Sequence, residues 1–474
     1  MKRAKRIYIL LGVLIVVCAA AFAVIEYEEQ KELIQNSGEV ILEVNADEVQ
    51  SLSWEYESET LAFHRDGTWL YDEDEAFPVD EDKINELLDQ FREFSAAFII
   101  EEVTDYGQYG LDEPICTIDL ATEEESYEIL LGDYSTMDSQ RYVSIGDGNV
   151  YLVANDPLDY FDAVLSDMID HDETPDFDQV ESIQFTGPET YEVVYEEDSS
   201  NTYCSDDVYF RKQGDTLLPL DTTRVNSYLS GISSLNPTDY VTYNASEEDL
   251  ATYGLDDPEL IVSVDYVAED SETGEETASV FTISVSRDPA ERSAASEETE
   301  AAEDTEAEET DEEEITAYVR IGESKIIYQI TGSSYESLMA ASYNDLRHQE
   351  VLTADFSDIT GFDVTLEGTL YQITSTGEGD DKVFSYDEEE LETSDLQSAL
   401  ENLIASGFTD EEPTEKEEIS LTVYLDNENY PEVQIQLYRY DGEQCLAVVD
   451  GEPVSLVPRS SVVDLIEAIN AIVL

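Results

Sequence analysis

Positively charged residues are scarce in this 474-residue chain. Lysine and arginine together number 21 against 114 aspartates and glutamates, so the formal net charge is −93. A protein that binds nucleic acid presents a basic surface to the phosphates, and this composition excludes one of the ordinary kind. The excess of acid also disfavours direct adhesion to anionic lipid, and it keeps the protein soluble by repelling other acidic surfaces.

Histidine is rarer still, and the sequence lacks the known catalytic motifs. No two of the three histidines have metal-ligand spacing on one helix, and there is no phosphate-binding loop, dinucleotide fingerprint or nucleophile elbow. His171 and His348 each follow a predicted helix, where a cation favours the helix end. We therefore expect no enzyme, no cofactor and no dedicated metal site. The acid clusters are compatible with weak binding of divalent cations, and a hydrolase that uses paired acids is the lowest-ranked alternative.

Cysteine is too sparse and too scattered to form a disulfide framework. The four cysteines are Cys18, Cys116, Cys204 and Cys445. Buried free thiols are the simpler expectation, with a single bridge as the alternative.

One long stretch without charge occurs, at residues 7–25, directly after four basic residues. Nineteen residues in a helix span about 28 Å, close to the thickness of a bilayer core. The stretch predicts a single transmembrane helix with a cytoplasmic N-terminus and an extracytoplasmic remainder. A cleaved signal peptide, with Ala21-Phe22-Ala23 as its cleavage site, is the alternative. Lipidation at Cys18 is disfavoured because Val17 precedes it.

The remaining chain repeats itself. Two segments share a six-residue motif, Tyr-Gly-Leu-Asp-acid-Pro, and each is preceded by an aromatic residue with a proline nine positions later. The residues that carry the repeat are Trp69, Pro78, Tyr109, Gly110, Leu111, Asp112 and Pro114 in the first copy, and Phe210, Pro219, Tyr253, Gly254, Leu255, Asp256 and Pro258 in the second. An eroded third version begins at Gly407. Repetition of this kind is typical of a scaffold built from copies of one unit.

Each copy has strands, a helix, more strands and a closing helix. In the first copy, Ile84, Leu87, Leu88 and Phe91 form one apolar helical stripe, and Asp80 is placed to begin that helix. Asp221 takes the same place in the second copy. A closing helix is expected around Leu158 to Met168. Hairpin-like strand spacing indicates antiparallel pairing, so we expect the α+β class: an N-terminal transmembrane helix followed by about three tandem repeats, each of antiparallel strands and two helices.

These features divide the chain into five segments. They are a basic cytoplasmic tail (1–6), a transmembrane helix or uncleaved signal anchor (7–25), repeat 1 (40–172), repeat 2 (173–350) with an acidic disordered insert (289–314), and a diverged repeat 3 (351–474).

The repeated motif has turn-forming residues at each position. Gly accepts positive φ, Pro fixes φ, and Asp can bond to its own downstream backbone. We favour the interpretation that the motif serves only to form a turn, and a docking loop is the alternative.

The segments Asp66-Gly67-Thr68-Trp69, Pro78-Val79-Asp80, residues 109–114 and Leu131-Gly132-Asp133 together resemble a bacterial family called domain of unknown function 4340. The resemblance implies a membrane-anchored, extracytoplasmic protein associated with export-type ABC transporters, and it brings no catalytic residues. In the second copy, Ser286-Arg287-Asp288 stands in place of Leu-Gly-Asp.

Two functions follow as hypotheses. The first is a non-enzymatic, membrane-anchored accessory or scaffold subunit of an ABC-type transport or envelope complex, with protein partners. The second is an acidic cell-envelope binding module or adhesin, assisted by calcium, and it rests on the acidic, tyrosine-rich composition.

Overall fold

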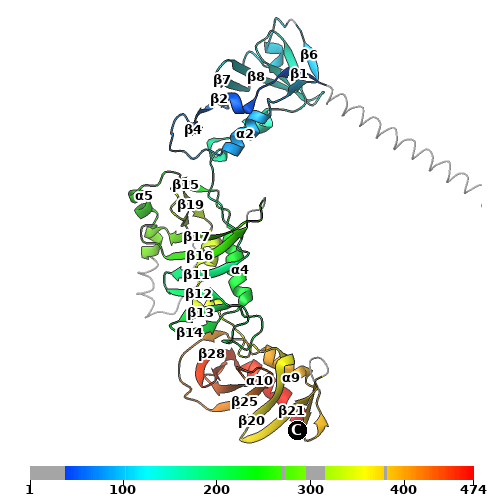
Figure 1. Ribbon diagram of the computed structural model, residues 1–474, viewed down its shortest axis with the longest axis vertical. Coiled ribbons are helices and arrows are strands. Elements are labelled where there is room, and N and C mark those ends of the chain that lie inside the picture. Colours follow the sequence, from blue (N-terminus) through cyan, green and yellow to red (C-terminus); the bar gives the residue numbers. More distant parts are fainter. Residues whose placement is uncertain (1–37, 102, 270–272, 295–314, 378–381, 474) are drawn as a thin grey trace, which may run out of the picture. The chain divides into compact units, whose positions relative to one another are not determined.

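The chain folds into two compact units, which divide between His171 and Asp172. The computed structural model describes residues 38–101, 103–269, 273–294, 315–377 and 382–473. Within them are one two-stranded sheet and three large sheets, and every pairing of neighbouring strands is antiparallel (Figure 1). The first unit holds one large sheet, and the second unit holds the other two.

The first unit is an eight-stranded sheet with a short two-stranded sheet beside it. The large sheet consists, in spatial order, of β4 (Thr68–Tyr71), β3 (Glu59–Asp66), β2 (Val49–Tyr56), β7 (Cys116–Thr122), β8 (Ser126–Ser135), β9 (Gln140–Ser144), β10 (Val150–Val153) and β6 (Phe98–Ile100). The small sheet pairs β1 (Glu39–Leu42) with β5 (Phe94–Ala96). The helices of this unit are α2 (Glu81–Asp89) and α3 (Leu158–Phe161).

The second unit contains two nine-stranded sheets. The first of them runs β14 (Thr216–Pro219), β13 (Tyr209–Gln213), β12 (Tyr191–Tyr195), β11 (Val180–Thr186), β16 (Leu260–Glu269), β17 (Glu276–Arg287), β18 (Ala317–Ile321), β19 (Ile327–Ile330) and β15 (Tyr240–Thr242). The other runs β23 (Glu389–Glu390), β22 (Val383–Tyr386), β21 (Thr369–Thr376), β20 (Ile359–Leu366), β25 (Glu417–Leu425), β26 (Glu432–Arg439), β27 (Gln444–Val449), β28 (Glu452–Pro458) and β24 (Gly407–Phe408). Their helices are α4 (Thr222–Ser233), α5 (Glu247–Thr252), α7 (Gly332–Met339), α8 (Tyr343–Leu346), α9 (Ser394–Glu401) and α10 (Arg459–Val473).

The three large sheets share one order of strands. In each, the opening strand (β2, β11 or β20) pairs on one side with its hairpin partner and on the other with a long strand from after the helix (β7, β16 or β25). A short strand between the helix and that long strand lies at the far edge of the sheet; these edge strands are β6, β15 and β24. The same connection therefore occurs three times along the chain.

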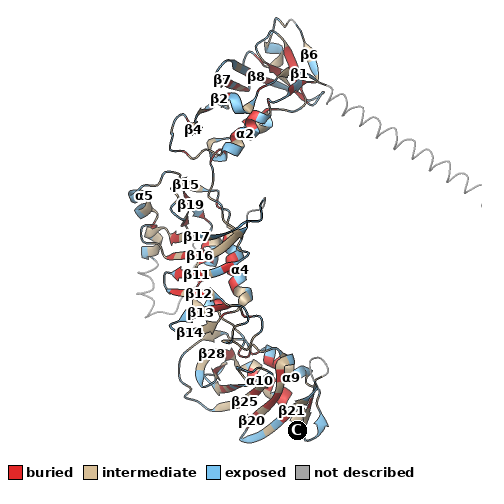
Figure 2. Cartoon of the chain, viewed as in Figure 1, coloured by how far each residue is buried: buried red, intermediate tan, exposed pale blue. Residues whose placement is uncertain are grey.

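Local sequence explains where the first helix of each of the first two large sheets begins. The carboxylate of Asp80 accepts a hydrogen bond from the backbone N–H of Lys83, and Asp221 does the same for Thr223 and Arg224. Both acids thus satisfy donors that a helix start leaves open, as expected from the sequence. The buried residues of α2 are Ile84, Leu87 and Leu88, and Figure 2 shows burial concentrated where helices face the central strands.

The α+β class expected from the sequence is wrong. The described part of the chain is mostly antiparallel β-sheet, and of the helices named above all but α10 and α4 have fewer than ten residues. The predicted closing helix around Leu158 to Met168 is only the four-residue α3 followed by a 3-10 turn. Val164 interrupts it with extended backbone (φ −99°, ψ 169°), so the apolar spacing there comes from two separate turns.

The predicted transmembrane helix and single-pass localisation are corrected as well. Among the described residues, every helix is too short or too polar to cross a membrane. The predicted span at 7–25 lies outside the described residues, so the structure does not support the membrane topology that was inferred from it. Of the acidic insert, residues 289–294 are helical, and the rest also lies outside the described part.

Aromatic packing under the first sheet generates a stability prediction. Phe161 is fully buried, with its ring 5.5 Å from that of Trp54 and 5.7 Å from that of Phe91. Phe161→Ala should lower the free energy of unfolding of the first unit by about 3–5 kcal/mol, because it leaves a cavity between the sheet and α2. The only tryptophans, Trp54 and Trp69, lie in this unit, so tryptophan fluorescence during urea unfolding of the full chain reports on it.

The control is Val164→Ala, since Val164 is 45% exposed. We expect it to change the free energy of unfolding by no more than about 0.5 kcal/mol. Equal losses in the two variants would contradict the packing argument.

Candidate functional site

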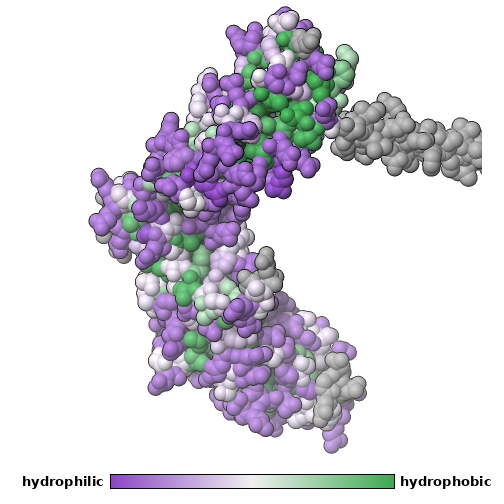
Figure 3. Space-filling model, turned by 45° about the horizontal axis from the view of Figure 1, so that its top comes forward, coloured by the Kyte–Doolittle hydropathy of each residue, from purple (hydrophilic) through white to green (hydrophobic). Residues whose placement is uncertain are grey.

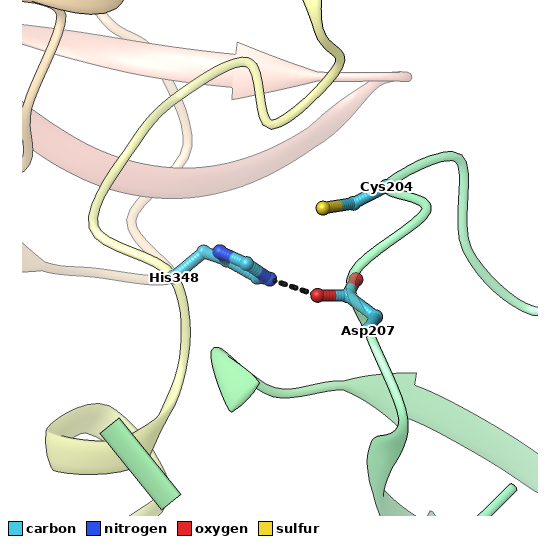
Figure 4. A group of neighbouring side chains, drawn as sticks. All are labelled: Cys204, Asp207 and His348. Atoms are coloured by element: carbon cyan, nitrogen blue, oxygen red, sulfur yellow. Dashed lines mark hydrogen bonds and ion pairs between the residues drawn. The ribbon is translucent and has the colours of Figure 1, made fainter. Parts of the chain in front are cut away.

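Three chemically reactive side chains meet in the second unit. Cys204 and Asp207 belong to the loop between β12 and β13, and His348 follows α8 in the segment that leads to the third large sheet. Figure 4 shows His348 directed at Asp207, with the Cys204 thiol beside them. We call this group the Cys–Asp–His cluster. One potential ligand atom from each residue lies within 4.8 Å of the other two.

Hydrogen bonds hold the cluster in place. Nε2 of His348 lies 2.8 Å from Oδ1 of Asp207, and the Thr202 hydroxyl donates to Oδ2 of the same carboxylate at 2.6 Å. The backbone N–H of Cys204 donates to the Thr202 hydroxyl at 3.0 Å. The Asp207 side chain is 1% exposed and that of His348 is 18% exposed. A buried carboxylate is therefore satisfied by two partners from different parts of the chain.

The electrostatics of the cluster follow from burial among acids. Burial alone lowers the pKa of His348, but the hydrogen bond and charge of Asp207, with the charges of Asp221 and Glu350, outweigh it and raise the pKa. Burial and the Asp207 carboxylate raise the pKa of the Cys204 thiol to about 12. The thiol is thus protonated at neutral pH, and this argues against a nucleophilic cysteine.

The sequence did not reveal this group. His348 was expected to cap a helix, but its imidazole bonds to Asp207, 141 residues away in the chain. The described cysteines are free, as expected: Cys116 and Cys445 are buried, and Cys204 is partly buried. No local spacing connects Cys204 or Asp207 with His348, because only the packing of the loop against the inter-sheet segment brings them together.

The repeated motif of the first copy lies in the connection between β6 and β7. Tyr109 ends a 3-10 turn and its ring lies 5.0 Å from that of Tyr142 in β9. Gly110 has φ +70°, and a Cβ there would lie 2.9 Å from the backbone nitrogen of Asp133. Leu111 is buried, whereas Asp112 is exposed and Pro114 is half-buried. The turn is pressed against β8, where Gly132 lies directly under the Tyr109 carbonyl.

The second copy repeats this geometry with different partners. The Tyr253 ring lies 4.8 Å from that of Tyr318, and Gly254 has φ +72°. Leu255 is buried, Asp256 is exposed and Pro258 is half-buried.

An ion pair follows the second motif. Glu259 accepts hydrogen bonds from the backbone N–H and the guanidinium of Arg287, at 2.8 and 3.1 Å, and from the hydroxyl of Tyr335 at 3.1 Å. Burial tends to raise the pKa of Glu259, but these bonds outweigh it and lower the pKa. The pair ties the turn to β17 and to α7.

The other repeat residues lie before the first helix of each sheet. Trp69 is buried in β4, and Pro78 accepts a hydrogen bond from the backbone of Asp170. Phe210 is buried in β13 and faces Pro219 of β14 across the ladder.

The third copy departs from the motif. Gly407 lies in strand β24 without a positive φ, so the eroded version at this position is not the same turn.

The sequence model of one family matches the chain. This family is described as domain of unknown function (DUF4340), and the match covers residues 69–258 and, overlapping, 211–422. No curated protein and no solved structure matched the chain.

The close approach at Gly110 generates a testable prediction. Gly110→Ala should destabilise the first unit by about 1–3 kcal/mol more than Gly67→Ala, measured by tryptophan fluorescence during urea unfolding. Both glycines have positive φ (+70° and +83°), but only a Cβ on Gly110 meets other atoms within 4 Å. Equal destabilisation would show that backbone conformation alone explains the motif glycine.

The ion pair of Glu259 predicts a dependence of stability on pH. Because its folded-state pKa lies below the ordinary value of 4.5, its contribution is present above that value and is lost as pH falls through the folded pKa. Glu259→Gln should therefore lower the free energy of unfolding of the second unit at pH 7 by about 1–3 kcal/mol, and this difference should shrink as the pH is lowered from 7 through the folded-state pKa, below 4.5. Glu248→Gln, at an exposed position, is the control, and a constant difference between wild type and Glu259→Gln across this range would contradict the prediction.

Proposed function

The chain belongs to the family described as domain of unknown function 4340, and we propose that it is a non-enzymatic accessory or scaffold subunit of an ABC-type transport or envelope complex. The association with a transporter rests on the family resemblance described above. The scaffold role rests on the structure of the described units.

Repetition of one sheet supports a scaffold. Three large sheets with the same order of strands enlarge the available surface without requiring a new fold at each step. Loops and edge strands of such sheets can each contact a partner while the cores remain unchanged.

The observation that carries the proposal is an exposed apolar surface on the first unit. Phe98 in β6 is 61% exposed and Val40 in β1 is 50% exposed, and Ile41, Ile99 and Ile100 beside them are half-buried. Figure 3 shows hydrophobic side chains gathered on this part of the unit. Contiguous apolar surface on an otherwise acidic protein is typical of a protein-binding site.

The corresponding edge of the third large sheet supports this interpretation. There, the guanidinium of Arg347, from the segment that precedes the sheet, lies 4.4 Å from the ring centre of Phe408 in β24. An aromatic residue on this edge thus packs against a preceding part of the chain. We propose that a transporter subunit packs against Phe98 in the first unit, through an apolar surface with few acids, because like charges would repel it.

Affinity purification tests the proposal. The full-length protein with a C-terminal tag is crosslinked in cells of its source, purified and analysed by mass spectrometry. We expect to recover the ATPase and permease subunits of an ABC transporter with the wild type. Recovery should fall at least ten-fold for Phe98→Glu, since a charge in the docking surface opposes burial.

Val280→Glu is the matched control, because Val280 is 67% exposed but belongs to β17 in the second unit. It should leave recovery unchanged. Absence of transporter subunits from the wild-type sample, or equal recovery with Phe98→Glu, would overturn the proposal.

A further inference from the structure

The Cys–Asp–His cluster contains the donor atoms of a transition-metal site. A thiol sulfur, an imidazole nitrogen and a carboxylate oxygen lie within 4.8 Å of one another. Sulfur and imidazole ligands select zinc and its neighbours over calcium and magnesium, which prefer oxygen alone. We propose that Cys204, Asp207 and His348 bind one Zn²⁺ ion, a function separate from docking to a transporter.

The spacing is close to what tetrahedral zinc requires. Bonds of about 2.0–2.3 Å place neighbouring ligand atoms roughly 3.3–3.7 Å apart. Nε2 of His348 and Oδ1 of Asp207, now 2.8 Å apart, have to separate by about 0.5 Å. The sulfur lies within 4.8 Å of both atoms, so it has to approach them by at most about 1.3 Å. Side-chain rotations of Cys204 and His348 supply such movements without a change in the backbone.

Surrounding groups already orient the ligands. The Thr202 hydroxyl holds the second oxygen of Asp207, so that Oδ1 faces the imidazole. On the other side of the ring, Nδ1 of His348 lies 3.8 Å from a carboxylate oxygen of Glu350. A carboxylate behind the ligating histidine is the usual outer partner in zinc sites, where it fixes the ring and raises its basicity.

The charge of the surroundings favours a cation. The single imidazole of His348 is close to three carboxylates, those of Asp207, Asp221 and Glu350. Of these three, Asp221 also pairs with Arg224, at 3.4 Å. Binding of Zn²⁺ releases the thiol proton of Cys204 to solvent, and His348 binds through an unprotonated Nε2 as the neutral imidazole whose proton is on Nδ1, the nitrogen nearer Glu350. The ion then compensates the thiolate and the Asp207 carboxylate, and water completes the fourth position.

The ion would connect two parts of the second unit. Cys204 and Asp207 come from a loop of the second large sheet, whereas His348 lies in the segment that leads to the third. Next to it, backbone hydrogen bonds from Val351 to Leu403 and from Ala405 to Gln349 connect this segment to the residues that follow α9. Zinc would therefore stabilise the connection between the two nine-stranded sheets, as a structural zinc site does.

Cobalt substitution tests the site in the full-length protein. After removal of metal with a chelator, Co²⁺ is added and the near-ultraviolet band of thiolate-to-cobalt charge transfer is recorded. This band distinguishes the cluster from nonspecific binding by the many surface carboxylates, which produce none. Competition of Zn²⁺ against a chromophoric chelator then measures affinity and stoichiometry.

We expect one Co²⁺ per chain with a thiolate band, displaced by one equivalent of Zn²⁺. Cys204→Ser and His348→Gln should abolish the band, and Glu350→Gln, which keeps all three ligands, should weaken zinc binding by about 10–100-fold. His64→Gln is the matched control, because His64 and Asp72 form a comparable pair at 2.6 Å that is exposed and outside the cluster. It should leave the band and the affinity unchanged.

Several outcomes would overturn the proposal. One is a wild-type protein that shows no thiolate band, a result that does not depend on how any variant folds. Another is a band that persists in Cys204→Ser. A third is zinc affinity equal in the wild type and Cys204→Ser while circular dichroism shows both folded.

Discussion

The pairing between the two halves of each large sheet is the constraint on which the structure depends. β2 pairs with β7, β11 with β16 and β20 with β25, and each pair joins strands separated by a helix and the far edge strand. Closing such a loop costs conformational entropy, so the pairing has to be stabilised by buried side chains from both of the paired strands. In the first sheet, Trp54 faces Ile118, and both are buried. A slip of one residue would turn these side chains to the opposite face, so burial also determines the register.

The repeated turn is a consequence of this pairing. The chain has to return from the far edge of the sheet to its centre. It does so in a turn whose backbone lies against β8 in the first copy and against β17 in the second. In the first copy, two glycines, Gly110 and Gly132, allow that close approach. In the second copy, Arg287 follows Ser286 on the facing strand, and the Glu259–Arg287 pair adds hydrogen bonds there. The same geometry is thus supported by different chemistry.

The acidic composition gives the few cations distinct structural roles. Arg141 is buried, where it donates to the Gly132 carbonyl and to Asp156. Arg287 pairs with Glu259, and Arg347 lies over the rings of Tyr343 and Phe408. In a chain with 114 acids, a buried carboxylate such as Asp207 has few arginines or lysines available as partners. Its partner is a histidine, and this places an imidazole beside a thiol.

Several features were determined by the sequence alone. The helix starts at Asp80 and Asp221 followed from local capping chemistry, and antiparallel pairing followed from hairpin spacing, because both depend on residues close in the chain. The balance of helix and sheet was not determined by the sequence. The apolar spacing over Leu158 to Met168 fits one helix and also two separate turns, and only the extended backbone at Val164 decides between these alternatives. The Cys–Asp–His cluster was decided by tertiary structure alone. Cys204 and His348 are distant in sequence, and their proximity depends on how a loop of one sheet packs against the segment that leads to the next.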